Sequence, residues 1–460
     1  MEEQGSLLKR IPIPQIYLNY SPPTENISEK YWGGDIRIGD LTGDGKVDFV
    51  VYKSIGGMKP CFIGAFNING EPLWQYGEKN LKILENDSKK LIYTESPSRP
   101  GPILVYDIDQ DGRTEVICLF ADQELLSGKI STNSLCASNL ELLILDGETG
   151  KVKKKAQHKI INCSNAYIDG ELHLPNYVHQ RILAANFSGN ENAQDFLLKI
   201  ANNILAFNHN LELLWHYENK YYIYSKHASY IPAVGDLNKD GLDEVNGGHF
   251  GLNNKGEVIW EKNLGLHLDS VIIDQWDEEN AAIISGGGQV LDKNGDHLLE
   301  LGHKYIPHGQ EVRFGKLSNH YKGKQLVFRY NGHTTQVMVV TQEGEILSRF
   351  DVDESPNNTG LEIINWDEKY PGLIYSPVGL YNLFGEKIVF FPDLPDPTGG
   401  RMGWYHCLPI NLYENDFEEI ILYDPYSYEI FIYGSSQIDR DKEFFAYKHT
   451  PRQFNPRIMD

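Results

Sequence analysis

The sequence predicts an all-β protein: a single β-propeller over residues 1–460, with eight blades of four antiparallel strands each. Short strands joined by Gly or Asn turns recur along the chain with several spacings of about 40 to 50 residues, which is typical of propeller blades. Helical periodicity of hydrophobic residues is nearly absent. Seven blades are the alternative, because the first and last units are hard to delimit.

The outer half of each unit is predicted to be a β-hairpin. The hairpins are FNINGEPLWQY, LDGETGKVKKK, FNHNLELLWHY, LNNKGEVIWEK, LDKNGDHLLEL, VTQEGEILSRF, YNLFGEKIVFF and a weaker IFIYGSSQIDR. The inner halves are predicted to begin near Asp35, Pro102, Arg181, Tyr230, Asp269, Glu311, Gly360 and Tyr405. The remaining segments, 1–30 and 441–460, are expected to close or brace the ring.

Three acidic loops share one spacing. In GDLTGDGKVDFVVYK, YDIDQDGRTEVICLF and GDLNKDGLDEVNGGH, oxygen-bearing side chains alternate, a glycine follows the third, and a carboxylate closes the loop eight residues after the first. Such loops converge their oxygens as a hard cation requires, so three matched copies favour Ca²⁺ over plain Asp- and Gly-rich turns. The predicted metal ligands are Asp40, Thr42, Asp44, Asp48, Asp107, Asp109, Asp111, Glu115, Asp236, Asn238, Asp240 and Glu244.

The acidic loop changes along the chain. The third unit keeps only Asn186, Ser188, Asn190 and a displaced Asp195, and the fifth to eighth units lose the pattern. Metal binding is therefore expected in units one, two and four.

The composition limits the partners. A formal net charge of −22 argues against nucleic acid and anionic membranes. Five scattered cysteines without CxxC spacing are interpreted as buried thiols rather than disulfides or zinc ligands. The N-terminal segment has no hydrophobic run long enough for a signal peptide, so we expect a cytoplasmic protein, or a secreted one if the chain was trimmed.

Basic and aromatic residues recur at one end of the predicted blades. Residues just before each first strand and just after each second strand should surround a channel mouth, on the face opposite the acidic loops. The catalytic candidates there are His308, His267, His227, Arg329 and Tyr330. The substrate-binding candidates are Lys53, Arg99, His179, His249, His333, Arg401 and Trp404. Structural histidines that bond a neighbouring blade, or a three-histidine transition-metal site, are the alternatives.

These residue types suit an acidic oligo- or polysaccharide. Arg or Lys neutralises a uronate carboxylate, aromatic faces stack on sugar rings, and His or Tyr moves protons in a β-elimination. On this reading, His308→Ala and Arg329→Ala abolish turnover and leave the melting temperature nearly unchanged. A non-catalytic carbohydrate- or protein-binding propeller and a His-dependent glycoside hydrolase acting on rhamnosyl-glucuronate are the alternatives.

The chain resembles the rhamnogalacturonan lyase family whose catalytic domain is a calcium-loaded eight-bladed propeller. The motifs GDLTGDGKVDFVVYK, FNINGEPLWQYG, VYDIDQDGRTEVICLF, GDLNKDGLDEVNGGH and RQFNPRIMD carry the resemblance, which is strongest over residues 33–260. It implies a polysaccharide lyase with Ca²⁺ and a glycan of rhamnose and uronic acid. Ulvan lyases and propeller enzymes acting on rhamnose linked to glucuronic acid fit nearly as well, and no catalytic residue is carried over.

Overall fold

The computed structural model confirms the predicted fold class: the chain is all-β, with eight propeller blades of four antiparallel strands. The described residues are 3–17, 36–55, 59–77, 103–121, 140–162, 166–168, 171–173, 181–200, 203–218, 232–265, 268–332, 334–353, 360–397, 404–413, 416–424 and 427–436. No helix among them is long and apolar enough to cross a membrane. By its contacts the chain divides into two compact units, one with blades one to three and one with blades four to eight.

The first three blades begin close to the predicted positions. Blade one is β3 (Ile36–Gly39), β4 (Asp48–Ile55), β5 (Lys59–Asn67) and β6 (Pro72–Gly77). Blade two is β7 (Ile103–Tyr106), β8 (Glu115–Ala121), β9 (Leu140–Leu145) and β10 (Val152–Ala156). Blade three is β13 (Arg181–Ala185), β14 (Asp195–Ile200), β15 (Asn203–Asn208) and β16 (Leu213–Glu218). Short elements outside the blades are η1 (Gln15–Tyr17), α2 (Lys159–Asn162), β11 (Ala166–Ile168) and β12 (Glu171–His173).

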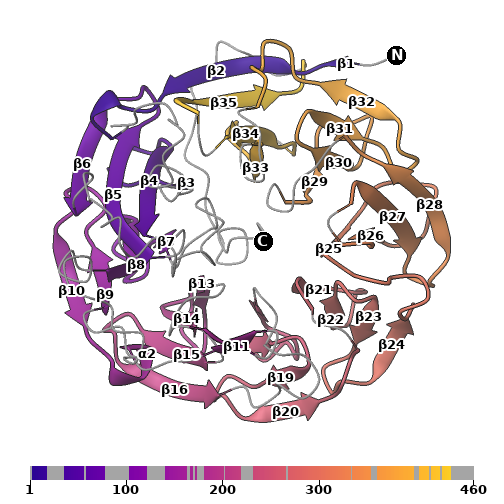
Figure 1. The fold of residues 1–460 in the computed structure, drawn as a ribbon, viewed down its shortest axis with the longest axis horizontal. Helices are drawn as coiled ribbons and strands as arrows, with labels where there is room; N and C mark the ends of the chain where they lie inside the picture. The colour runs from indigo at the N-terminus through magenta and orange to yellow at the C-terminus, as the bar shows by residue number, and fades with distance from the viewer. Residues whose placement is uncertain are drawn as a thin grey trace. The chain divides into compact units, whose positions relative to one another are not determined.

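Blades four to seven repeat the same order of strands, and Figure 1 labels all four strands in blades five to seven. Blade four is β17 (Ala233–Gly235), β18 (Glu244–Asn246), β19 (Phe250–Leu252) and β20 (Val258–Glu261). Blade five is β21 (Val271–Gln275), β22 (Ala281–Ser285), β23 (Gln289–Leu291) and β24 (His297–Glu300). Blade six is β25 (Glu311–Gly315), β26 (Gln325–Arg329), β27 (Gln336–Thr341) and β28 (Ile346–Asp351). Blade seven is β29 (Ile363–Ile364), β30 (Leu373–Ser376), β31 (Gly379–Tyr381) and β32 (Lys387–Phe390).

Blade eight takes its fourth strand from the N-terminal part of the chain. It consists of β33 (His406–Ile410), β34 (Glu419–Tyr423), β35 (Glu429–Gly434) and β2 (Ser6–Pro12), which lies beside β35 (Figure 1). The short strand β1 (Glu3–Gln4) adds to blade seven parallel to β32. The eighth hairpin predicted at IFIYGSSQIDR is therefore wrong over its described part, because β2 and not a following strand pairs with β35.

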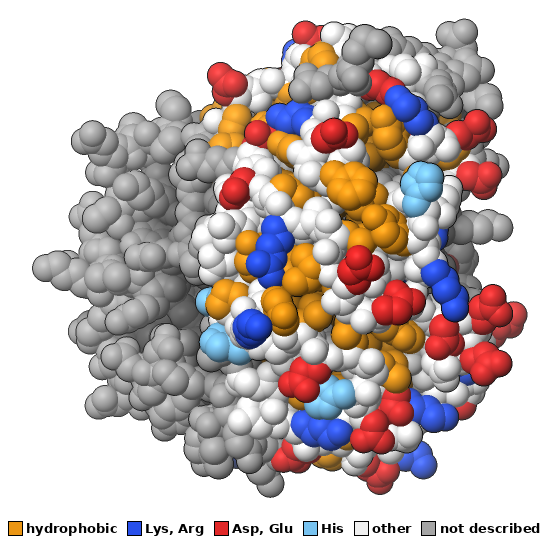
Figure 2. Space-filling model, turned by 90° about the vertical axis from the view of Figure 1, so that its right-hand side faces the viewer, with side chains coloured by type: hydrophobic (Ala, Val, Ile, Leu, Met, Phe, Trp, Pro, Cys, Tyr) orange, Lys and Arg blue, Asp and Glu red, His pale blue; other side chains and the backbone are white. Residues whose placement is uncertain are grey.

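The blades pack through hydrophobic side chains on both faces of their middle strands. Every residue of β14 and β26 is buried, and their central residues, 196–198 and 326–328, are hydrophobic without alternation. The fourth strands alternate instead, and exposed Val258, Ile259 and Leu298 lie on β20 and β24. Figure 2 shows hydrophobic, acidic and basic side chains mixed over the viewed face. The fourth strand is thus the solvent-facing edge of a blade.

A repeated contact joins neighbouring blades at their hairpin turns. Trp74 of blade one lies over Gly150 of blade two and donates its indole N–H to the carbonyl of Gly147 at 2.6 Å. In the same way Trp260 lies over Gly295 in blade five, and an added Cβ on that glycine would lie 2.5 Å from the indole. Both glycines also have a positive φ, so the turn and the close approach require the same residue type.

A buried acceptor at the start of the second strand stabilises the loop between the first two strands. In blades one, two and four this acceptor is the predicted closing carboxylate, which takes the N–H of Leu41, Ile108 or Leu237 at 2.9 to 3.1 Å. Three further blades use the same bond although the acidic pattern is lost, and their acceptors are Asp195, Gln325 and Glu419. The closing position therefore has a structural role that does not depend on a metal.

Glu419 should make the stability of blade eight pH-dependent. It is fully buried, and burial raises its pKa from 4.5 to about 7. Because the folded state favours the neutral acid, this contribution is complete below pH 4.5 and is lost as the pH rises to about 7. Glu419→Gln keeps the acceptor, as Gln325 does in blade six, and should exceed the wild type at pH 8 by up to about 3 kcal/mol.

The measurement is urea unfolding of both proteins at pH 5 and at pH 8. The converse substitution, Gln325→Glu, is the matched control and should lower the stability more at pH 8 than at pH 5. A difference between wild type and Glu419→Gln that does not change with pH would show that the carboxyl is not held neutral.

Candidate functional site

Each blade has two chemically different ends. In blade six, Gly315 pairs with Gln325 beside the loop that joins the first two strands, whereas Glu311 pairs with Arg329 at the other end. We call the first the loop end and the second the strand-start end. The antiparallel order also puts the hairpin of the third and fourth strands at the loop end. The acidic loops and the described catalytic candidates, His308, Arg329 and Tyr330, therefore lie at opposite ends of their blades.

His308 lies at the strand-start end, where the main chain holds it firmly. Its N–H donates to the carbonyl of Tyr330 at 3.2 Å, and its carbonyl accepts the N–H of Gly332 at 2.7 Å. Its Nε2 atom lies 3.6 Å from Oδ2 of Asp269. The His308 side chain is 34% exposed, whereas that of Asp269 is 2% exposed. A partly exposed imidazole, whose Nε2 atom is itself buried, thus lies against a buried carboxylate that precedes the first strand of the neighbouring blade.

Asp269 was not predicted as a functional residue. From the sequence it was expected only near the start of an inner strand, in the segment LHLDSVIID. An acidic residue inside such a hydrophobic segment was the available signal, because a buried carboxylate requires a partner. The partner comes from another blade, so the pairing is visible only in the structure.

Arg329 is held by protein groups. Its Nη1 lies 3.0 Å from Oε2 of Glu311, and its Nη2 donates to the carbonyl of Thr334 at 3.2 Å. The other oxygen of Glu311 accepts the N–H of Leu361, at the start of blade seven, at 3.0 Å. Arg329 is 2% exposed, so its guanidinium links strands of blade six. Tyr330, the next residue, is half-buried and its ring lies under the guanidinium of Arg349 at 5.4 Å.

The described residues include only some of the other candidates. His249 is buried, and its Nδ1 accepts the N–H of Leu264 at 3.1 Å, which places the ring proton on Nε2 when the ring is neutral. Trp404 is half-buried ahead of β33. Lys53 lies in β4, but its side chain is outside the described part. Also outside the described residues are His267, His227, Arg99, His179, His333 and Arg401.

A cavity of about 440 Å³ lies at the strand-start end of blade five. Its volume falls within the range of about 300 to 1,000 Å³ that is usual for small-ligand sites. Two of its lining residues, Leu268 and Gly309, directly adjoin Asp269 and His308 in the chain. The full lining is Asn263, Leu264, Gly265, Leu268, Gly287, Gln289, His297, Glu300, Gly302, His303, Ile306 and Gly309.

The cavity wall combines fixed and available polar groups. Gln289 is fixed: its amide donates to the carbonyl of Leu264 at 3.0 Å and accepts the hydroxyl of Ser285 at 2.8 Å. The side chains of His297, Glu300 and His303 are exposed residues of the same lining. A rigid wall with imidazole, carboxylate and glycine backbone groups suits a hydroxyl-rich ligand.

At the loop end, the acidic loops of blades one and four fit a hard cation. The first carboxylate of each, Asp40 or Asp236, accepts two loop N–H groups at 3.0 to 3.1 Å. Burial raises the pKa of Asp48 to about 6 and that of Glu244 to about 7, and neighbouring carboxylates act in the same direction. A divalent cation would offset this concentrated buried charge.

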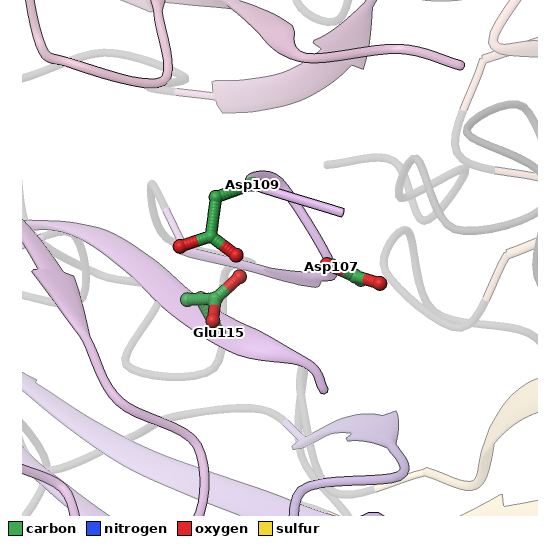
Figure 3. A group of neighbouring side chains, drawn as sticks. All are labelled: Asp107, Asp109 and Glu115. Carbon is green, nitrogen blue, oxygen red and sulfur yellow. The ribbon is translucent and has the colours of Figure 1, made fainter. Parts of the chain in front are cut away.

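The loop of blade two holds the most compact acidic cluster. Carboxylate oxygens of Asp107, Asp109 and Glu115 lie within 4.8 Å of one another, and such a group can hold a metal ion. Figure 3 shows the carboxylates of Asp109 and Glu115 facing each other, with Asp107 to one side. Oxygen donors at this spacing suit a divalent cation, and the Ca²⁺ expected from the sequence stays a prediction.

The comparisons with known proteins identify the fold. No family model matches the chain, and no curated protein matches it by sequence. Among solved structures, rhamnogalacturonan lyase YesW is 16% identical with a TM-score of 0.64, over 90% of this chain and 74% of that one. The Bacillus licheniformis rhamnogalacturonan lyase PL11 is 16% identical with a TM-score of 0.63, over 96% and 77%. The V. cholerae biofilm matrix protein Bap1 is 11% identical with a TM-score of 0.56, over 99% and 97%.

The chain therefore shares its fold with two rhamnogalacturonan lyases and with a biofilm matrix protein. Identities of this size show the fold alone, and the fold is common to proteins of different kinds. The function has to be argued from the residues at the two ends of the blades.

Arg329→Ala should destabilise the protein, contrary to the expectation from sequence. The substitution leaves the buried carboxylate of Glu311 without its guanidinium, and breaking a buried pair on one side costs about 3 to 5 kcal/mol. Urea unfolding at pH 7 measures the loss. The double variant Glu311→Gln, Arg329→Met removes both charges and should recover part of it. An unchanged unfolding midpoint for Arg329→Ala would show that the pair does not hold blade six together.

Proposed function

We propose that this protein is a polysaccharide lyase that cleaves a glycan of rhamnose and uronic acid by β-elimination. The observation that carries the proposal is the half-exposed His308, held against buried Asp269 beside a cavity of about 440 Å³. The shared fold with two rhamnogalacturonan lyases supports it. The substrate class is inferred from the predicted basic residues, because Arg and Lys bind the carboxylate of an acidic sugar.

His308 is the proposed base. Its imidazole removes the proton alpha to the uronate carboxylate, the electron pair forms the new carbon–carbon double bond, and the bond to the glycosidic oxygen breaks. Asp269 positions the ring and stabilises the imidazolium that forms. The leaving oxygen takes a proton from Tyr330 or from water. Since the Arg329 guanidinium is bonded to Glu311, neutralising the uronate falls to the other predicted basic residues, Lys53, Arg99 and Arg401.

His308→Ala should lower the rate of product formation by about 10² to 10⁴-fold, the usual contribution of a general base. The assay follows the ultraviolet absorbance of the unsaturated sugar formed from rhamnogalacturonan, ulvan or rhamnosyl-glucuronate oligosaccharides. Asp269→Asn should retain a weaker activity, since it disturbs the orientation of the ring and not the ring itself.

His320→Ala is the matched control, because His320 is an exposed histidine in the loop at the opposite end of blade six. It should leave the rate unchanged. Full activity of His308→Ala on every substrate that the wild type cleaves would rule out His308 as the base.

A non-catalytic carbohydrate-binding propeller is the second candidate. This candidate is supported by the same fold in a biofilm matrix protein, whose name describes no lyase activity. Calorimetry and product analysis on the same oligosaccharides separate the two functions: binding without any unsaturated product supports the second. A cytoplasmic location remains a prediction from the sequence.

A further inference from the structure

Seven hairpins of the third and fourth strands contain one inserted residue at the same place. In each, the register shifts so that one residue of the fourth strand has no partner across the hairpin. A β-bulge of this kind redirects its extra side chain. Six blades have Leu or Ile there, and blade two has lysine: the residues are Leu73, Lys153, Leu214, Ile259, Leu298, Leu347 and Ile388.

The ammonium group of Lys153 lies among the carboxylates of the blade-two loop. Its Nζ is 2.7 Å from Oδ2 of Asp109, 2.8 Å from Oε1 of Glu115 and 3.4 Å from Oδ2 of Asp111. An ammonium group has three N–H donors, so these three acceptors satisfy it. Glu115 is 1% exposed, and Lys153 therefore supplies a positive charge next to a buried negative one.

At the four predicted ligand positions, the blade-two loop also has one more acid than the loops of blades one and four. At the third position of the loop, blade one has Thr42 and blade four has Asn238, whereas blade two has Asp109. The extra acid and the exceptional lysine occur in the same blade and contact each other. Counting only the four predicted ligand positions of each loop, and Lys153 in blade two, each of the three sites has the same formal net charge of three negatives. The positive charge that blade two has at the bulge thus offsets the additional negative charge of Asp109 in its loop.

We propose that Lys153 is the resident cation of the blade-two loop, and that a divalent cation binds there only by displacing it. The proposal rests on the expectation that the loops of blades one and four bind Ca²⁺, and does not depend on the lyase activity. Both cations need oxygens of Asp109 and Glu115. The Oδ1 atom of Asp109 is buried without a hydrogen-bond partner, and it is available to a divalent ion once Lys153 withdraws.

The three loops are then not equivalent. Blades one and four bind Ca²⁺ without competition, because their bulge residues, Leu73 and Ile259, have no charge. Blade two is stabilised by its own lysine when Ca²⁺ is scarce. Its affinity for Ca²⁺ should be at least about tenfold lower, since the displaced ammonium stays close to the ion and repels it.

The test is calorimetric titration of the whole chain with Ca²⁺ after chelator treatment. Lys153→Leu, which restores the residue type of the other bulges, should bind one more Ca²⁺ with high affinity than the wild type. It should also lose more thermal stability in chelator than the wild type and regain it with Ca²⁺. Leu73→Met changes the same position in blade one without changing charge, and should alter neither quantity.

Two results would overturn the proposal. One is equal numbers and affinities of Ca²⁺ sites in wild type and Lys153→Leu. The other is the loss of a high-affinity site when Asp109→Asn is introduced into the wild type. If Lys153→Leu fails to fold, Lys153→Met keeps the length of the side chain without its charge and undergoes the same titration.

Discussion

The bond between the closing acceptor and the loop N–H is the interaction on which each blade depends. It joins the start of the second strand to the turn that precedes it, at 2.7 to 3.1 Å in six blades. A buried N–H without an acceptor would destabilise the blade by about 1 to 3 kcal/mol. A carboxylate satisfies it but adds a buried charge, which a cation, a proton or an ammonium group can offset.

The blades compensate the buried charge of the closing residue in different ways. Blade six avoids the charge with Gln325, blade eight raises the pKa of Glu419, and blade two provides Lys153. In blades one and four burial raises the pKa of Asp48 and Glu244 in the same way, and their acidic loops fit a divalent cation that would offset the charge. All of these groups lie at the loop end, so the strand-start end is free to hold His308, Asp269 and the cavity without competing for the same charges.

Much of the fold could be predicted from the sequence because its signals are local. Turn glycines, hydrophobic runs and the spacing of the acidic loops lie within short segments, and they located seven hairpins and the starts of eight first strands. The fourth strand of blade eight could not be predicted in this way, because β2 and β35 are separated by most of the chain.

The candidate site was less predictable, since its pairings are long-range. Arg329 resembled a substrate ligand in the sequence, but its partner Glu311 is on the neighbouring strand and Leu361 is in the next blade. The partners of Asp269 and Lys153, which are His308 and Asp109, come from distant segments and are visible only in the structure. Asp195 looked displaced, yet it accepts the same loop N–H as the closing residues of other blades.

We assign the sugar and the cation sites to opposite ends of the blades. A crystal structure of His308→Ala, which prevents turnover, with Ca²⁺ and a uronate-containing oligosaccharide tests this most directly. We expect the sugar at the strand-start end, with its uronate ring beside residue 308 and Asp269, and Ca²⁺ in the loops of blades one and four. A sugar bound through Ca²⁺ at the acidic loops, with the strand-start cavity empty, would contradict the assignment of the chemistry to the strand-start end.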